Sequence, residues 1–128
     1  MLNQKTHACC YFCNSNIALK NEAFMKINFY KYQGAGNDFI LIDHTMSTLK
    51  NIDNKQIEEL CNRRFGIGAD GLMFVTKHES YDFEMHYFNA DGKLGSMCGN
   101  GGRCIVAFAK QLGLINRETN FLAVDGPH

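Results

Sequence analysis

The residue types best suited to chemistry gather around Cys98, which directly precedes the stretch Gly99-Asn100-Gly101-Gly102. The apolar segment that follows predicts a helix, so this cysteine would lie at the helix start. Free backbone N–H groups and the helix dipole at that position favour thiolate over thiol. A thiolate is both a nucleophile and a base, which makes Cys98 the candidate catalytic residue.

The same helix start could hold an anionic substrate group beside the sulfur. Gly99 and Asn100 would contribute backbone N–H groups, and small residues there leave room for a ligand. Two further asparagines, Asn37 and Asn89, lie at predicted turns beside glycine-rich stretches. From the residues alone, a turn role and a ligand contact are equally good interpretations of both.

The other thiols and the histidines fit structural roles better. Cys104 falls inside the apolar helix and Cys61 inside another predicted helix, where a buried thiol behaves as a small inert hydrophobe. Three histidines could pair with Cys98 in a protease-like dyad, but none lies in a recognisable motif. They are His44, His78 and His86.

Two more glycine-rich stretches share the pattern G-x-G-x-D, at residues 34–38 and 66–70. Neither has the full spacing of a dinucleotide loop or a P-loop, and no GK[ST] follows. We therefore expect no nucleotide binding.

Residues 1–24 lack periodicity of either kind, and the patterned sequence begins at Met25. We interpret them as a disordered or non-native leader, and residues 25–128 as the domain. The cysteines and the histidine of residues 1–24 could suggest a metal cluster, but no second CxxC completes a zinc site. These residues are His7, Cys9, Cys10 and Cys13.

Hydrophobic patterning supplies the elements that must position the candidate site. Apolar or alternating runs predict strands at 27–32, 39–42, 72–76, 81–88 and 119–124. A first helix is predicted over 54–64, capped by Asp53 or Asn54 and ended by Gly66. The second is the apolar helix after Cys98, at about 99–113, which Gly113 ends.

Composition limits the class of protein. The chain has 128 residues, 45% of them hydrophobic, and 13 basic residues balance 13 acidic ones. These values fit one domain with its own core and no basic patch for nucleic acid or an anionic membrane. No apolar run approaches the roughly 20 residues of a membrane helix, and no signal-peptide core is present. We expect a cytoplasmic protein with reduced thiols that binds a small molecule.

Four blocks in order resemble diaminopimelate epimerase: GAGNDF at 34–39, RRFGIGADGL at 63–72, FNADG at 88–92 and CGNGGRC at 98–104. The resemblance spans residues 25–128. It implies an α+β fold in which each of two similar halves is a mostly antiparallel sheet wrapped around a central helix. It also implies interconversion of LL- and meso-diaminopimelate, on the route to lysine and peptidoglycan, without pyridoxal phosphate.

By the same resemblance, Cys98 is one of two catalytic cysteines that face each other across the substrate. One removes the α-proton as a thiolate, and the other delivers a proton to the opposite face as a thiol. Asn37, Asn89, Gly99 and Asn100 match the substrate-contacting positions of the family. Diaminopimelate is then the expected partner, and a homodimer stays open.

The chain departs from the family pattern at three positions. Some members have glutamine, used for substrate binding, where this chain has Gly71; serine where it has Lys93; and alanine where it has Gly102. The change at Gly71 removes a possible polar contact with the distal end of the substrate. We also interpret His128 as the boundary of a first half whose partner half, with the second cysteine, is missing, and we expect that half to be inactive alone.

Alternative functions remain open from the sequence. Another isomerase of the proline racemase superfamily, or a phenazine-biosynthesis type that lacks the cysteine pair, is the nearest enzyme. A non-enzymatic domain that binds a small anion is the alternative of another class. A thiol redox role is disfavoured, because Cys98 and Cys104 lie almost two helical turns apart and are too distant to bridge.

Overall fold

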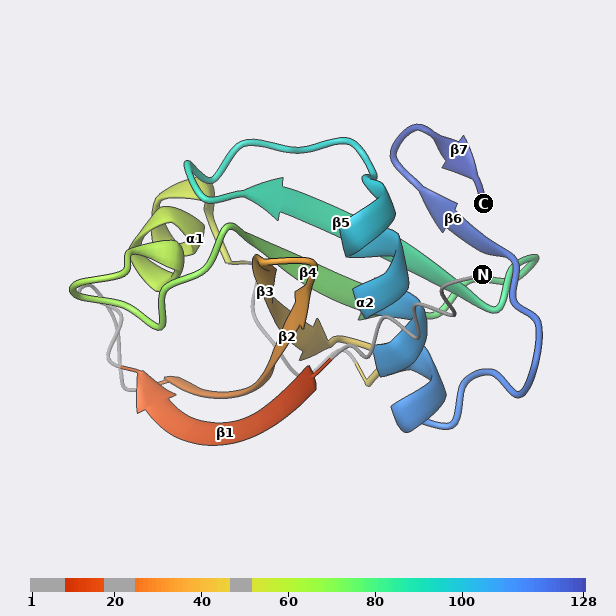
Figure 1. The fold of residues 1–128 in the computed structure, drawn as a ribbon, viewed down its shortest axis with the longest axis horizontal. Helices are drawn as coiled ribbons and strands as arrows, with labels where there is room; N and C mark the ends of the chain where they lie inside the picture. Colours follow the sequence, from red (N-terminus) through yellow and green to blue (C-terminus); the bar gives the residue numbers. More distant parts are fainter. Residues whose placement is uncertain (1–8, 18–24, 47–51) are drawn as a thin grey trace, which may run out of the picture.

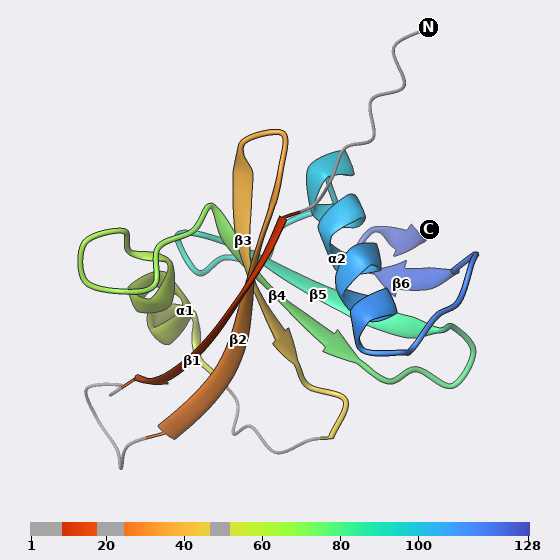
Figure 2. The same ribbon diagram turned by 60° about the horizontal axis from the view of Figure 1, so that its bottom comes forward.

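A single seven-stranded sheet, with strands in chain order from β1 to β7, forms the centre of the computed structural model, which describes residues 9–17, 25–46 and 52–128. The strands are β1 (Cys9–Ile17), β2 (Met25–Gly34), β3 (Asn37–Asp43), β4 (Gly71–Thr76), β5 (Phe83–Asn89), β6 (Phe121–Ala123) and β7 (Gly126–Pro127). The described helices are α1 (Asn54–Cys61) and α2 (Gly99–Gln111), and they lie on opposite sides of the sheet (Figures 1 and 2).

The sheet is mostly antiparallel, as predicted. Neighbouring strands run antiparallel except for β3–β4 and β5–β6, which are parallel. Each parallel pair needs a crossover connection, and each crossover contains one of the helices. The sheet curves around α2 (Figure 1), which confirms the predicted sheet wrapped around a helix at about 99–113.

The two central strands, β3 and β4, are buried on both faces. On β3, Phe39 and Leu41 join the core beneath α2, whereas Ile40 and Ile42 join the core beneath α1. The same alternation occurs on β4. A strand covered on both faces has no polar side, which explains why the sequence shows continuous apolar runs here rather than alternation.

Helix α1 begins where predicted and ends earlier than the predicted 54–64. Asp53 caps its start within a capping box, and the helix stops at Cys61. The side chain of Asn62 then accepts the N–H groups of Arg64 and Phe65, which closes the end of the helix. Gly66 must be a glycine, because a Cβ there would lie 2.0 Å from a backbone oxygen of α1.

The N-terminal segment differs from the expectation of a leader without regular structure. Residues Cys9–Ile17 form β1, which pairs with β2 along its whole length. A strand at the edge of a sheet can be held by backbone hydrogen bonds, which any sequence can form. Its residues therefore need not alternate between apolar and polar. Residues 1–8 and 18–24 lie outside the described residues, and so do the side chains of His7, Cys9, Cys10 and Cys13, for which a metal cluster was disfavoured.

The C-terminal end is a small hairpin rather than one strand. The predicted strand 119–124 is shorter, as β6, and it turns back through β7, which the sequence did not predict. Strand β7 has only two residues, too few to show the alternation of apolar and polar side chains that predicts a strand. In the described part of the chain, no helix is long and apolar enough to span a membrane.

Candidate active site

Cys98 is the N-cap residue of α2, as predicted. Its backbone is extended (φ −120°, ψ 159°), so the chain changes direction at this residue and the helix follows. The N–H of Gly101 donates to Sγ at 3.3 Å, and the N–H of Gly102 donates to the Cys98 carbonyl oxygen at 2.8 Å. The residue is exposed to solvent. The sulfur therefore lies at the positive end of the helix dipole, in contact with a backbone amide.

Glycine is required at position 101 for this arrangement. A Cβ on Gly101 would lie 2.9 Å from Cε of Met73, on β4, and 3.3 Å from Sγ of Cys98. The first turn of α2 therefore packs directly against the sheet, with the thiol at its edge. A larger residue would have to displace either the helix or the sulfur.

The amides of Gly99 and Asn100 stay available for a ligand. The first N–H groups of any helix lack intrahelical partners, and those of Gly101 and Gly102 bond to Cys98 instead. Among the described residues, no hydrogen bond from the other two amides occurs. Together with the positive end of the helix dipole, these two amides are donors that can hold an anion next to the sulfur.

Asn37 and Asn100 are brought into direct contact. A two-residue turn at Ala35 and Gly36, both with positive φ, joins β2 to β3 and places Asn37 beside the start of α2. Nδ2 of Asn100 donates to Oδ1 of Asn37 at 2.6 Å, and the Arg103 guanidinium donates to Oδ1 of Asn100. Two predicted site residues that are far apart in the sequence thus belong to one row of hydrogen-bonded side chains, formed by Asn37, Asn100 and Arg103.

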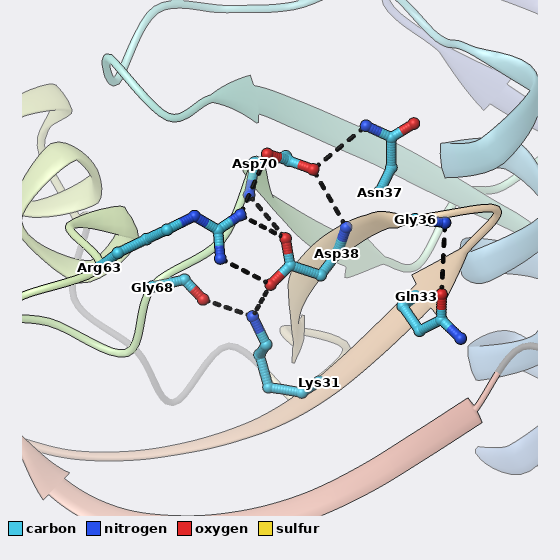
Figure 3. A network of polar contacts seen from close by, with 8 residues as sticks. All are labelled: Lys31, Gln33, Gly36, Asn37, Asp38, Arg63, Gly68 and Asp70. Atoms are coloured by element: carbon cyan, nitrogen blue, oxygen red, sulfur yellow. Dashed lines mark hydrogen bonds and ion pairs between the residues drawn. The ribbon is translucent and has the colours of Figure 1, made fainter.

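A network of charged residues fixes the other end of Asn37 (Figure 3). Its Nδ2 donates to Asp70 at 3.1 Å, and the same carboxylate accepts the backbone N–H of Asp38 at 3.2 Å. Arg63 contacts both carboxylates, at 2.7 Å from Asp38 and 3.1 Å from Asp70. The orientation of the Asn37 amide is therefore set by its partners at both ends.

Asp38 is the charged centre of this network. Its hydrogen bond to Arg63 is the largest cause that lowers the pKa of its carboxyl far below the usual range, and Lys31 acts in the same direction at 2.6 Å, while burial opposes both. Lys31 also donates to the carbonyl oxygen of Gly68. Strands β2 and β3 and the loop before β4 are thereby tied together next to the site.

Asn89 lies at the end of β5, opposite Gly71 in the register of β4 and β5. Its Oδ1 would be 3.0 Å from a Cβ built on Gly95, so it contacts the segment that leads to Cys98. Its backbone also closes the following turn, since the N–H of Gly92 donates to its carbonyl oxygen at 2.9 Å. In the parts of the chain that the structure describes, the Asn89 side chain makes no hydrogen bond to Asn37, Cys98 or Asn100.

The remaining thiols have the packing roles that the sequence predicted. Cys61 and Cys104 are buried, and burial is the main cause that raises the pKa of each to about 11. Of the histidines, His86 lies 3.1 Å from Thr76 Oγ1 and 3.6 Å from Glu84. Its neighbour Met85 joins the core beneath α2, so His86 lies on the opposite face of the sheet from the helix start.

The charged network was not predicted from the sequence. A signal was present, because both G-x-G-x-D stretches end in the aspartates that Arg63 joins, Asp38 and Asp70. The two stretches even bond to each other, as the N–H of Asp70 donates to the Asp38 carbonyl oxygen at 2.9 Å. Taken singly each stretch was uninformative, and their pairing requires the parallel alignment of β3 with β4.

Comparisons with a family model and with individual known sequences point to the same family. Residues 29–126 match the family model described as diaminopimelate epimerase. A diaminopimelate epimerase of Flavobacterium psychrophilum is 53% identical over 80% of this chain and 40% of its own length. That of Chlorobaculum tepidum is 54% identical over 73% of this chain and 36% of its own length. The chain therefore spans about two fifths or less of the length of these relatives.

Comparison with solved structures gives the same fold at low identity. A phenazine biosynthesis protein of the PhzF family from Bacillus anthracis aligns with TM-score 0.60 and 21% identity, over 80% of this chain and 35% of that one. A hydroxyproline epimerase from Agrobacterium vitis, with bound trans-4-hydroxy-L-proline, aligns with TM-score 0.55 and 14% identity, over 94% and 40%. At such identities the likeness shows the architecture alone.

Proposed function

This chain belongs to the diaminopimelate epimerase family, and from that premise we propose that it forms the first half of an isomerase that interconverts LL- and meso-diaminopimelate without pyridoxal phosphate. The second half, with the other cysteine, would account for the length of the relatives that the chain does not span. The observation that carries the proposal is Cys98, an exposed thiol at the N-cap of α2 whose sulfur accepts the N–H of Gly101.

In the proposed reaction, the Cys98 thiolate removes the proton from the α-carbon and becomes a thiol. The electron pair of the broken C–H bond passes to the α-carbon and its carboxylate. A thiol from the second half then gives its proton to the opposite face, which inverts the centre and leaves a thiolate there. Run in reverse, the two cysteines exchange roles, so both directions use the same groups.

Without a cofactor, the protein itself must stabilise the negative charge that develops on the substrate, and the helix start can do so. An α-carbanion next to a carboxylate concentrates negative charge on the carboxylate oxygens. The amides of Gly99 and Asn100 lie where they can donate to that group while the sulfur faces the α-carbon. Because backbone amides cannot rotate away, they need no reorganisation as the charge develops.

The polar row through Asn37 and Asn100 would orient the rest of the substrate. Asn37 is held at one end by Asp70 and at the other by Asn100, and these contacts fix which atom of the amide faces a ligand. Asn89 would bind from the end of β5. We also propose a cytoplasmic location, since the described thiols of Cys61, Cys98 and Cys104 are free, which is typical of a reducing compartment.

The test needs a completed enzyme, made by joining this chain to the part of the Flavobacterium psychrophilum relative that it does not cover. We expect this enzyme to convert LL- to meso-diaminopimelate with no added pyridoxal phosphate, as measured by chiral chromatography. We expect the chain alone to be inactive. Cys98→Ala should abolish conversion, whereas Cys61→Ala, on the opposite side of the sheet from α2, should retain it.

A completed enzyme that binds diaminopimelate without converting it would contradict the proposal. That result would favour the alternative of a small-anion-binding domain. Conversion that survives Cys98→Ala unchanged would equally exclude the thiolate mechanism.

A further inference from the structure

The ring of Tyr87 on β5 lies in a slot between two glycines, Gly71 on β4 and Gly95 in the segment that precedes α2. A Cβ on Gly71 would lie 2.5 Å from Cε2 of this ring, and a Cβ on Gly95 would lie 2.7 Å from Cε1. Both distances are far below van der Waals contact, so only glycine at these positions admits the ring. Phe39 closes the slot with an edge-on contact, at a centroid distance of 6.0 Å.

This slot adjoins the candidate site. Tyr87 and Asn89 are two residues apart on β5, so their side chains share one face of the sheet, and Gly71 pairs with Asn89. The segment from Gly95 leads within three residues to Cys98. The slot therefore places a phenol next to two residues that the proposed function assigns to the substrate.

The hydroxyl of Tyr87 lies close to Gly71. It would lie 2.9 Å from a Cβ on Gly71, and in the described residues it makes no hydrogen bond. Burial, followed by the negative charge of Cys98, raises the pKa of this phenol, so it stays protonated and able to donate. This oxygen is not one of the fully buried unpartnered atoms of the described residues, so a substrate group can reach it and accept its hydrogen.

We propose that Tyr87 is a specificity-determining residue, whose hydroxyl donates a hydrogen bond to a carboxylate of the amino-acid substrate bound beside Cys98 and Asn89. The inference rests on the proposed function and adds a residue to it. The lack of a side chain at Gly71 leaves this space to Tyr87, which presents its phenol there.

Tyr87→Phe in the completed enzyme tests the inference, because it keeps the ring in its slot and removes only the hydroxyl. We expect the KM for diaminopimelate to rise about tenfold, the size of one lost hydrogen bond to a charged group, with kcat within about twofold. The dissociation constant from calorimetry should rise equally. Tyr81→Phe is the matched control, since Tyr81 packs on His78 at a centroid distance of 5.1 Å, and it should change neither value.

An unchanged KM and dissociation constant for Tyr87→Phe, in an enzyme that epimerises normally, would overturn this inference and leave the proposed function intact. Equal losses in both variants would also overturn it, because they would mean a general effect of removing a phenol. A completed enzyme that neither binds nor converts diaminopimelate would overturn the inference together with the proposed function.

Discussion

At the scale of the residue, the backbone around Cys98 decides what its sulfur can do. The same residue type occurs at Cys104, in the same helix, and is buried there with its pKa raised to about 11. Cys98 is exposed at the helix start and accepts an amide hydrogen. Position along the helix, rather than the chemistry of cysteine, separates a reactive thiol from a packing one.

This difference predicts selective alkylation of the folded domain. At pH 8 a thiol with a pKa of about 11 is a thiolate in about one molecule in a thousand, and Cys104 is also shielded from reagent. Iodoacetamide should therefore modify Cys98 at least about tenfold faster than Cys104, followed by peptide mass spectrometry. As pH approaches 11, labelling of Cys104 should increase. Equal rates at pH 8 would contradict the assignment of Cys98.

The site residues were partly predictable from the sequence. Cys98, Gly99 and Asn100 are contiguous, so the prediction of one helix start was enough to group them. Asn37 required the resemblance to a family, because it joins Asn100 only through the fold. Tyr87 gave no signal at all, since its place depends on the absence of side chains at two distant glycines.

At the scale of the element, the start of α2 depends on how closely it approaches the sheet. Two adjacent glycines in its first turn face different neighbours. A Cβ on Gly101 would meet Met73 at 2.9 Å and the Cys98 sulfur at 3.3 Å, whereas a Cβ on Gly102 would meet the flexible thioether of Met97 at 3.1 Å. Alanine is also the residue that some family members have at the second position.

Alanine substitutions should therefore have opposite effects at these two glycines. Gly101→Ala should lower the free energy of unfolding by about 1–3 kcal/mol through overpacking. Gly102→Ala should raise it by up to about 1 kcal/mol, because alanine favours the helix and Met97 can move. Urea unfolding of both variants measures this difference. A loss of the same size in both would mean that close packing against β4 does not position the helix start.

Most helices and strands were predictable because the hydrophobic pattern of each lies within its own short segment of sequence. Strands β2 to β5 and helix α2 appear where apolar patterning indicated them. The end of α1 was wrong by three residues, since the cap at Asn62 depends on loop contacts rather than on helical spacing. Strands β1 and β7 were missed because their sequences have no hydrophobic pattern of their own. Each is defined only by its pairing with a neighbouring strand.

At the scale of the whole molecule, the proposed function assigns one thiol and one set of amides of the described chain to one side of the substrate. A two-base inversion needs a second acid on the opposite face, and the relatives are long enough to contain it. The charged network of Lys31, Asp38, Arg63 and Asp70 fixes this side of the site before any partner half is present. We therefore expect the second half to supply the other cysteine and not to reshape this one's surroundings.

The two-base mechanism is tested most directly by following the α-hydrogen of diaminopimelate by NMR, with the completed enzyme in deuterium oxide. We expect deuterium to enter the α-carbon as LL-diaminopimelate becomes the meso form, and Cys98→Ala to slow this inversion at least about a thousandfold. Inversion that retains the original α-hydrogen, or a Cys98→Ala enzyme that inverts at the wild-type rate, would contradict this mechanism.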